Sequence, residues 1–177
     1  DALARENATR LAILGYGHQA FSHARAISKI RNLTHVTLWG RDENRRIEAA
    51  TIIENELNIP CEAVGSAPEA VNEADIICTV TGAKDPILFG ADVPEGAHVN
   101  VVGSSFAGPA EVDNELVVKS CYFADYRPSV LAQGTEFIRA KEAGLIDEKH
   151  ILAEIGEVFD GKHQGRKSPQ DVTLYKS

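Results

Sequence analysis

Short apolar runs separated by segments of helical character extend along most of this chain. The first run is Leu11–Leu14, and the segment after it, Gln19–Ile30, places Ala20, Ala24, Ile27 and Ile30 on one helical face. Within the runs, apolar and polar residues do not alternate, which indicates strands that are covered on both faces. The runs that predict strands are Leu11–Leu14, Val36–Trp39, Cys61–Val64, Ile76–Val80, Val99–Val102 and Cys121–Ala124.

Helices are predicted between several of these strands. After Gln19–Ile30, a second helix starts with Asn44 as its N-cap and continues through Leu57, and Pro60 prevents its extension. Further predicted helices are Pro68–Glu73, Glu136–Ala143 and Ile151–Phe159, and a late β-like run covers Val172–Tyr175. This succession predicts an α/β fold with a doubly wound parallel sheet in the order 3-2-1-4-5-6.

A glycine-containing loop joins the first strand to the first helix. Gly15 allows a tight turn, Gly17 leaves room for a pyrophosphate at the backbone, and Ala20 lets the helix approach the strand. The helix begins at Gln19, and its free N–H groups favour phosphate. His18 could touch phosphate or ribose or face water, and we favour water. The alternative for the whole loop is an ordinary strand-to-helix turn, but its context favours dinucleotide binding.

Small and hydroxyl-bearing residues follow the fourth and fifth strands. In such a sheet, ligands bind beyond the carboxyl ends of the strands where the strand order reverses. Thr79, Val80 and Thr81 lie at the end of the fourth strand, and Gly103 and Ser104 follow the fifth. They leave room for a flat ring and offer hydrogen bonds to ribose and carboxamide groups. The alternative is that these residues only form turns.

The end of the second strand bears on the choice of cofactor. An NAD site usually has an acidic residue there for the ribose hydroxyls. Here Gly40 opens space and Arg41 brings a guanidinium that suits the 2′-phosphate of NADP. Asp42 could instead bind the ribose or pair with an arginine, and Arg41 could be a solvated surface charge. We favour NADP over NAD.

Composition narrows the class of protein. The chain of 177 residues suits one domain, and its net charge of -8 argues against a nucleic-acid or anionic-membrane partner. The three cysteines and six histidines have no metal-ligand spacing, so we expect no metal site and reduced thiols in a cytoplasmic protein. The sequence contains no methionine, and we interpret Asp1 as an internal position of a longer protein.

From about Leu11 to Ser177 the chain resembles the ornithine cyclodeaminase/mu-crystallin family. The glycine loop, the fourth-strand segment 74–81 and the fifth-strand segment 96–104 are similar to those of the family. The tail carries the most distinctive likeness, because a generic Rossmann domain has no reason to contain it. Its matching positions are 142–144, 154–158, Gly161, 165–166, Ser168 and 173–177.

The resemblance implies that residues 1–177 form an NAD(P)-binding Rossmann domain and that the family's substrate and dimerisation domain is absent. It also implies hydride transfer between nicotinamide and the α-carbon of an amino acid or cyclic imine, in a longer, homodimeric protein. Ser105 stands where cyclodeaminases and alanine dehydrogenases of the family have an acid/base aspartate. A serine cannot take up that proton near neutral pH, which favours imine reduction or another dehydrogenase chemistry. The alternative is a non-catalytic nucleotide or small-ligand binder of the mu-crystallin type.

Overall fold

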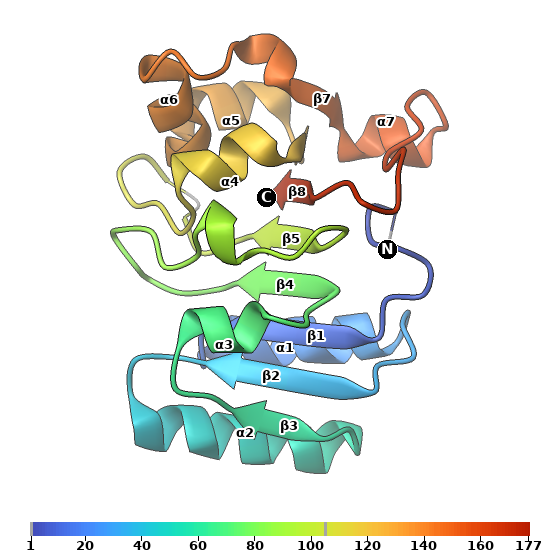
Figure 1. Ribbon diagram of the computed structural model, residues 1–177, viewed down its shortest axis with the longest axis vertical. Coiled ribbons are helices and arrows are strands. Elements are labelled where there is room, and N and C mark those ends of the chain that lie inside the picture. The colour runs from blue at the N-terminus through green and yellow to red at the C-terminus, as the bar shows by residue number, and fades with distance from the viewer. Residues whose placement is uncertain (1, 105) are drawn as a thin grey trace.

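The computed structural model describes residues 2–104 and 106–177, and a parallel sheet runs through them. Within these residues the sheet has eight strands in the order β3-β2-β1-β4-β5-β8-β6-β7. The arrowheads of β2, β3, β4, β5 and β8 point the same way in Figure 1, and every pair of neighbouring strands is parallel, so the loops after the strands gather at one edge. The strands are β1 (Arg10–Leu14), β2 (His35–Trp39), β3 (Cys61–Ala63), β4 (Ile76–Thr79), β5 (His98–Val101), β6 (Cys121–Ala124), β7 (Ile151–Glu154) and β8 (Thr173–Lys176).

The predicted fold class is confirmed, but the predicted strand order is right only for the first five positions. The late β-like run forms β8, which lies between β5 and β6 and pairs in parallel with both, so that Thr173 is opposite His98 on one side and Cys121 on the other. The predicted helix Ile151–Phe159 is wrong in its first half. Ile151 and Ala153 are buried and the intervening Leu152 is exposed, which is the alternation of strand β7.

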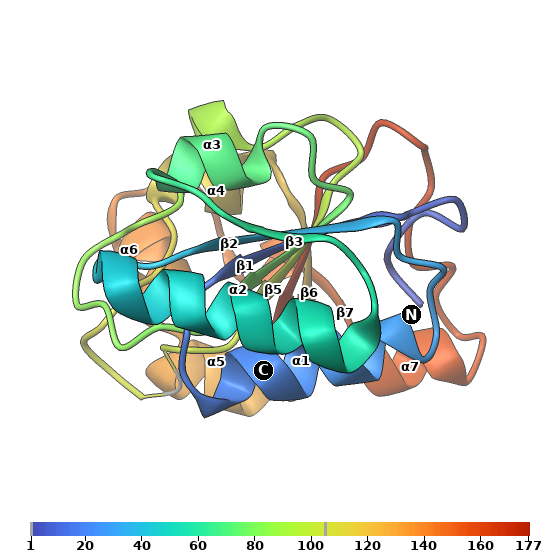
Figure 2. The same cartoon turned by 90° about the horizontal axis from the view of Figure 1, so that it is seen from below.

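Helices cover both faces of the sheet, with α1 and α2 on one face and α3 and α4 on the other (Figure 2). The N-cap of α2 is Asp42, not the predicted Asn44, because the Asp42 carboxylate accepts the N–H of Arg45 at 2.9 Å. The short helices α4 and α5 were not predicted. The helices are α1 (His18–Ser28), α2 (Glu43–Leu57), α3 (Ala67–Val71), α4 (Asn114–Lys119), α5 (Arg127–Gln133), α6 (Thr135–Glu142) and α7 (Ile155–Phe159), with short 3-10 turns at Gly90–Asp92 and Glu148–His150.

Each central strand contributes side chains to a hydrophobic core on both sides of the sheet. Leu11 and Ile13 of β1 pack in the core beneath α1 and α2, whereas Ala12 and Leu14 pack in the opposite core. Each fully buried Leu or Ile contributes about 1.5–3 kcal/mol of transfer free energy. Burial on both faces explains why the strand sequences show no polar alternation.

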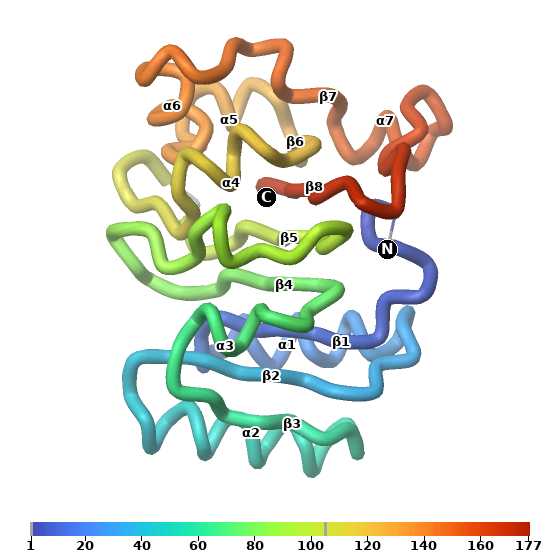
Figure 3. The backbone as a smooth tube through the Cα atoms, in the orientation of Figure 1, coloured from blue at the N-terminus to red at the C-terminus, as the bar shows by residue number. Residues whose placement is uncertain are grey.

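The N-terminal segment lies beside the segment that leads into β8 (Figure 3). The Leu3 carbonyl accepts hydrogen bonds from Arg166 Nε at 2.9 Å and from Thr173 Oγ1 at 3.0 Å. These contacts join the N-terminal segment to the start of β8, at the amino edge of the sheet. No helix within residues 2–104 and 106–177 is long and apolar enough to cross a bilayer.

Candidate functional site

A pocket of about 190 Å³ opens at the carboxyl edge of the sheet, beside the ends of β1, β2 and β4. This is the position at which the strand order reverses, because β1 leads to β2 on one side and β4 lies on the other. Open parallel sheets bind their ligands at that position. The residues that line the pocket are Gly15, Tyr16, Gly17, Trp39, Gly40, Arg41, Val80, Thr81, Gly82, Ala83 and Ile87.

Gly15 makes the turn out of β1 in a conformation that favours glycine. Its φ is +130°, and its N–H donates to the Trp39 carbonyl at 2.8 Å. A Cβ at this position would lie 2.7 Å from the Val80 carbonyl oxygen. Both the backbone conformation and the close approach of the β4 loop therefore exclude a side chain here.

Gly17 is the N-cap of α1, and the space around it is open. Among the described residues, no heavy atom would lie within 4 Å of a Cβ at Gly17, and no side chain caps this end of the helix. The first turn carries no acidic residue, so no carboxylate within it offsets its N–H groups and the positive end of the helix dipole. The open space at Gly17 fits a phosphate at the backbone.

The other predicted residues of the glycine loop lie around this opening. Ala20 is fully buried against the core, as expected of a small residue that lets α1 approach the sheet. His18 and Gln19 are exposed at the start of α1 and do not line the pocket. The cofactor contact of Gln19, and the choice for His18 between the cofactor and water, stay predictions.

The end of β2 has a different environment from the one expected. The space that Gly40 leaves is filled by the ring of Tyr16, which would overlap a Cβ at Gly40. Arg45 stacks its guanidinium on that ring, 4.6 Å from the centroid. Arg41 is exposed and lines the pocket, and Asp42 is engaged as the cap of α2. This arrangement places cationic side chains beside the pocket.

The loops after β4 and β5 are joined by the carboxylate of Glu111, which is fully buried. Thr81 donates to Glu111 Oε1 through both its N–H and its hydroxyl, each at 2.7 Å. Oε2 accepts the Thr79 hydroxyl at 2.8 Å and the Gly103 N–H at 2.6 Å. Thr81 and Val80 line the pocket, whereas Thr79 and Gly103 lie behind it.

Ser104 is also turned away from the pocket. It is fully buried, and its hydroxyl donates to the carboxylate of Glu136, which also accepts the Glu111 N–H at 3.0 Å. Burial lowers the pKa of the neighbouring Lys176, and the carboxylates of Glu136 and Glu111 oppose that shift. Contact of Thr79, Gly103 and Ser104 with the cofactor stays a prediction, and Ser105 lies outside the described residues.

Sequence reasoning missed Glu111, Glu136 and Tyr16. Glu111 joins residues that are 8 to 32 positions away in the chain, so no local spacing marks it. Its only signal is a single charge between two apolar residues, Ala110 and Val112. Tyr16 lies inside the predicted loop, but the sequence does not indicate that its ring occupies the space at Gly40.

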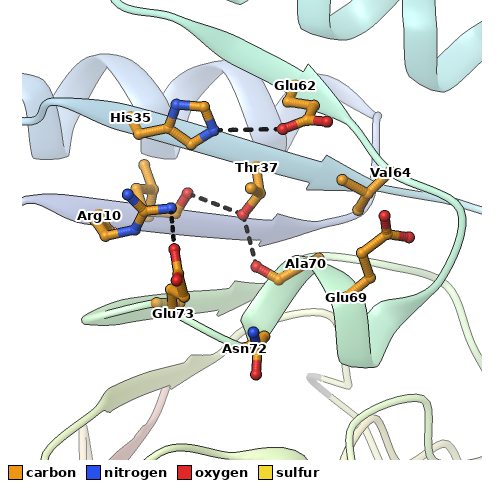
Figure 4. Close-up of a pocket in the computed structure, with 11 residues that line it drawn as sticks. Arg10, His35, Thr37, Glu62, Val64, Glu69, Ala70, Asn72 and Glu73 are labelled. Atoms are coloured by element: carbon orange, nitrogen blue, oxygen red, sulfur yellow. Dashed lines mark hydrogen bonds and ion pairs between the residues drawn. The ribbon is translucent and has the colours of Figure 1, made fainter.

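A second hollow, of about 150 Å³, begins at the amino ends of β1 and β2 (Figure 4). Several of its polar groups pair with one another: Arg10 with Glu73 at 2.8 Å, and the Thr37 hydroxyl with the Ala70 carbonyl at 2.7 Å. It lies away from the edge where parallel sheets bind ligands, so it is not the candidate site. Among the described residues, no group of three or more His, Cys, Asp or Glu could hold a metal ion.

Comparison with known proteins connects this geometry to a family. The family model described as "Ornithine cyclodeaminase/mu-crystallin family" matches residues 2–177. A Delta(1)-pyrroline-2-carboxylate reductase of Bacillus cereus is 33% identical over 176 residues, which are 99% of this chain and 54% of that protein. The ketimine reductase mu-crystallin of Mus musculus is 37% identical over 169 residues, 94% of this chain and 49% of that protein.

A solved structure supports the same relationship. The Delta(1)-pyrroline-2-carboxylate reductase of Thermococcus litoralis, in complex with NADH and L-proline, superposes with a TM-score of 0.97 at 32% identity, covering 99% of this chain and 55% of that one. The chain thus spans about half the length of the relatives that it matches. The match over nearly all of its own length establishes that this chain belongs to the ornithine cyclodeaminase/mu-crystallin family.

Proposed function

We propose that this chain is the nucleotide-binding part of a longer NAD(P)-dependent oxidoreductase that acts on the C–N bond of an amino acid or cyclic imine. One observation carries the proposal: the pocket at the reversal of strand order is lined by the glycine loop, the end of β2 and the β4 loop. These are the three segments that a dinucleotide contacts in such a sheet.

The proposed binding follows from the placement of each segment. The pyrophosphate lies against the backbone at Gly17, where no side chain of the described residues obstructs it, and the N-terminus of α1 compensates its charge. Adenosine lies toward the end of β2, near Arg41 and Tyr16. The nicotinamide half lies toward the loops after β4 and β5, and when bound it supplies the hydride.

The preference for NADP rests on the cationic side of the pocket. Arg41 reaches solvent at its rim, and Arg45 is held close by its stacking on Tyr16. Two guanidinium groups favour a 2′-phosphate over a free hydroxyl. The NADH bound to the Thermococcus litoralis relative supports the alternative, NAD.

The chemistry of the longer protein is proposed from its relatives. Two of them are named as reductases of pyrroline-2-carboxylate and of ketimines, both of which contain a C=N bond. We propose that the longer protein reduces a small cyclic imine, and that it forms a homodimer through its substrate domain. Ser105 at the position of the family's acid/base aspartate favours this chemistry over cyclodeamination.

Two titrations and one assay test the proposal. We expect the 177-residue chain to enhance the fluorescence of NADPH and NADH, with tighter binding of NADPH. Absence of binding for both would remove the proposal. The longer protein, assayed with cyclic imines, ornithine and alanine, should oxidise NADPH with the imines, and binding without turnover would favour the non-catalytic alternative.

A further inference from the structure

We propose that Glu111 is a positioning residue that sets the shape of the nicotinamide end of the pocket. The inference rests on the proposed function, because it assigns a role within the same site. Glu111 does not line the pocket. It acts through the two loops that follow β4 and β5, and its carboxylate is the feature that they share.

Glu111 is itself fixed on both sides by its backbone. Its N–H donates to Glu136 at 3.0 Å, and its carbonyl accepts the N–H groups of Ile87 at 2.9 Å and Leu88 at 3.1 Å. Ile87 lines the pocket, so this backbone contact connects Glu111 to the pocket wall. A residue held in this way provides a rigid point of attachment for its carboxylate.

The carboxylate draws the two loops into direct contact. Within the described residues it accepts four hydrogen bonds, two from Thr81, one from Thr79 and one from Gly103. A Cβ at Gly103 would overlap both the Thr81 carbonyl oxygen and Glu111. The close approach of the loops therefore requires glycine at position 103, and a buried carboxylate that accepts several N–H and O–H groups keeps them in place.

Because of where Glu111 and its hydrogen-bond partners lie in the sheet, we expect them to affect the binding of only one half of the dinucleotide. The glycine loop and the end of β2 belong to the half of the fold that holds the adenosine nucleotide, and β4 and β5 open the other half. Within residues 2–104 and 106–177, the hydrogen bonds of the Glu111 carboxylate all come from the end of β4 and the loops after β4 and β5. Loosening them should weaken contacts with nicotinamide and leave those with adenosine diphosphoribose intact.

The test compares NADH with ADP-ribose, which lacks the nicotinamide. In the wild-type chain, both oxygens of Glu111 accept hydrogen bonds. In Glu111→Gln one of them is replaced by an NH2 group, which cannot accept from those donors, so at least one loop is released. We expect this substitution to raise the Kd of the 177-residue chain for NADH about tenfold and to change the Kd for ADP-ribose less than about twofold. The fluorescence enhancement of bound NADH should fall. Thr79→Val removes a single hydrogen bond to Glu111, keeps the side-chain shape and should give the same split more weakly.

Asp75 offers a matched control at the opposite edge of the sheet. Its carboxylate accepts the N–H groups of Thr9 at 2.8 Å and Arg10 at 3.0 Å and pairs with Arg5. Asp75→Asn should lower thermal stability without separating the two affinities. The inference is overturned if both Glu111→Gln and Thr79→Val weaken NADH and ADP-ribose equally, or leave NADH binding and its fluorescence unchanged. If the wild-type chain binds neither ligand, the proposed function fails first, and the inference fails with it.

Discussion

The substitution Gly17→Val separates ligand binding from folding more cleanly than any other change in the glycine loop. A Cβ at Gly17 meets no heavy atom within 4 Å in the part of the chain that the structure describes, and the residue has φ −85° and ψ −174°, a conformation that valine accepts. The cost to the fold is limited to the weaker N-cap preference of valine, about 1 kcal/mol. By contrast, a side chain at Gly15 would require φ +130° and would lie 2.7 Å from the Val80 carbonyl oxygen.

The cost to binding is larger, because the valine side chain fills the space that the pyrophosphate needs. Hydrogen bonds to charged groups contribute about 1.5–3 kcal/mol each, so loss of two N–H contacts to phosphate costs at least about 3 kcal/mol, roughly a hundredfold in Kd. The assay is a fluorescence titration with NADPH and NADH, accompanied by thermal unfolding.

Gly156→Ala is the matched control, because Gly156 lies in α7 and a Cβ there also meets no described atom within 4 Å. It should leave both ligand affinities unchanged. The reasoning is refuted if Gly17→Val folds normally and binds both dinucleotides as tightly as the wild-type chain.

Two further predictions address cofactor choice and acid stability. Arg41→Ala should weaken NADPH binding about tenfold or more and leave NADH nearly unchanged, since it removes a guanidinium partner of the 2′-phosphate; equal losses for both cofactors would contradict that role. His98 is buried, and burial lowers its pKa to about 3. Because the folded pKa is depressed, the unfolded chain takes up the proton first, and stability is lost as pH falls from about 6.5 toward 3. Between pH 7 and pH 5 the free energy of unfolding, measured with urea, should fall by about 2 kcal/mol. The variant His98→Gln should show a weaker dependence of this free energy on pH. An unchanged dependence in the variant would contradict the assignment to His98.

Local patterns predicted the first half of the fold well. Among the runs that form β1 to β5, strands consecutive in the chain lie side by side, except that β4 pairs with β1 and not with β3. The place of β8 depends instead on pairing between residues far apart, such as Cys121 and Thr173. No local period encodes such a pairing, and α4, with six residues, is too short to show a helical repeat.

For the candidate site, too, local patterns could indicate the residues at strand ends but not the contacts between distant segments. The glycine loop, Arg41 and the β4 loop could be found because a strand end places them at one edge of the sheet. Glu111 could not be found, because its partners come together only after the sheet forms. The roles of the hydroxyls of Thr79 and Ser104 were equally hidden, since the carboxylates that accept them, Glu111 and Glu136, follow in later loops and helices.

The central claim is that a nicotinamide dinucleotide lies across the carboxyl edge of β1 and β4. Titration of the ¹⁵N-labelled chain with NADPH, followed by NMR, tests it most directly. The account predicts that the largest amide shifts occur at Gly15, Gly17 and Thr81. Shifts confined to the hollow around Arg10 and Glu73, or no shifts at saturating NADPH, would contradict it.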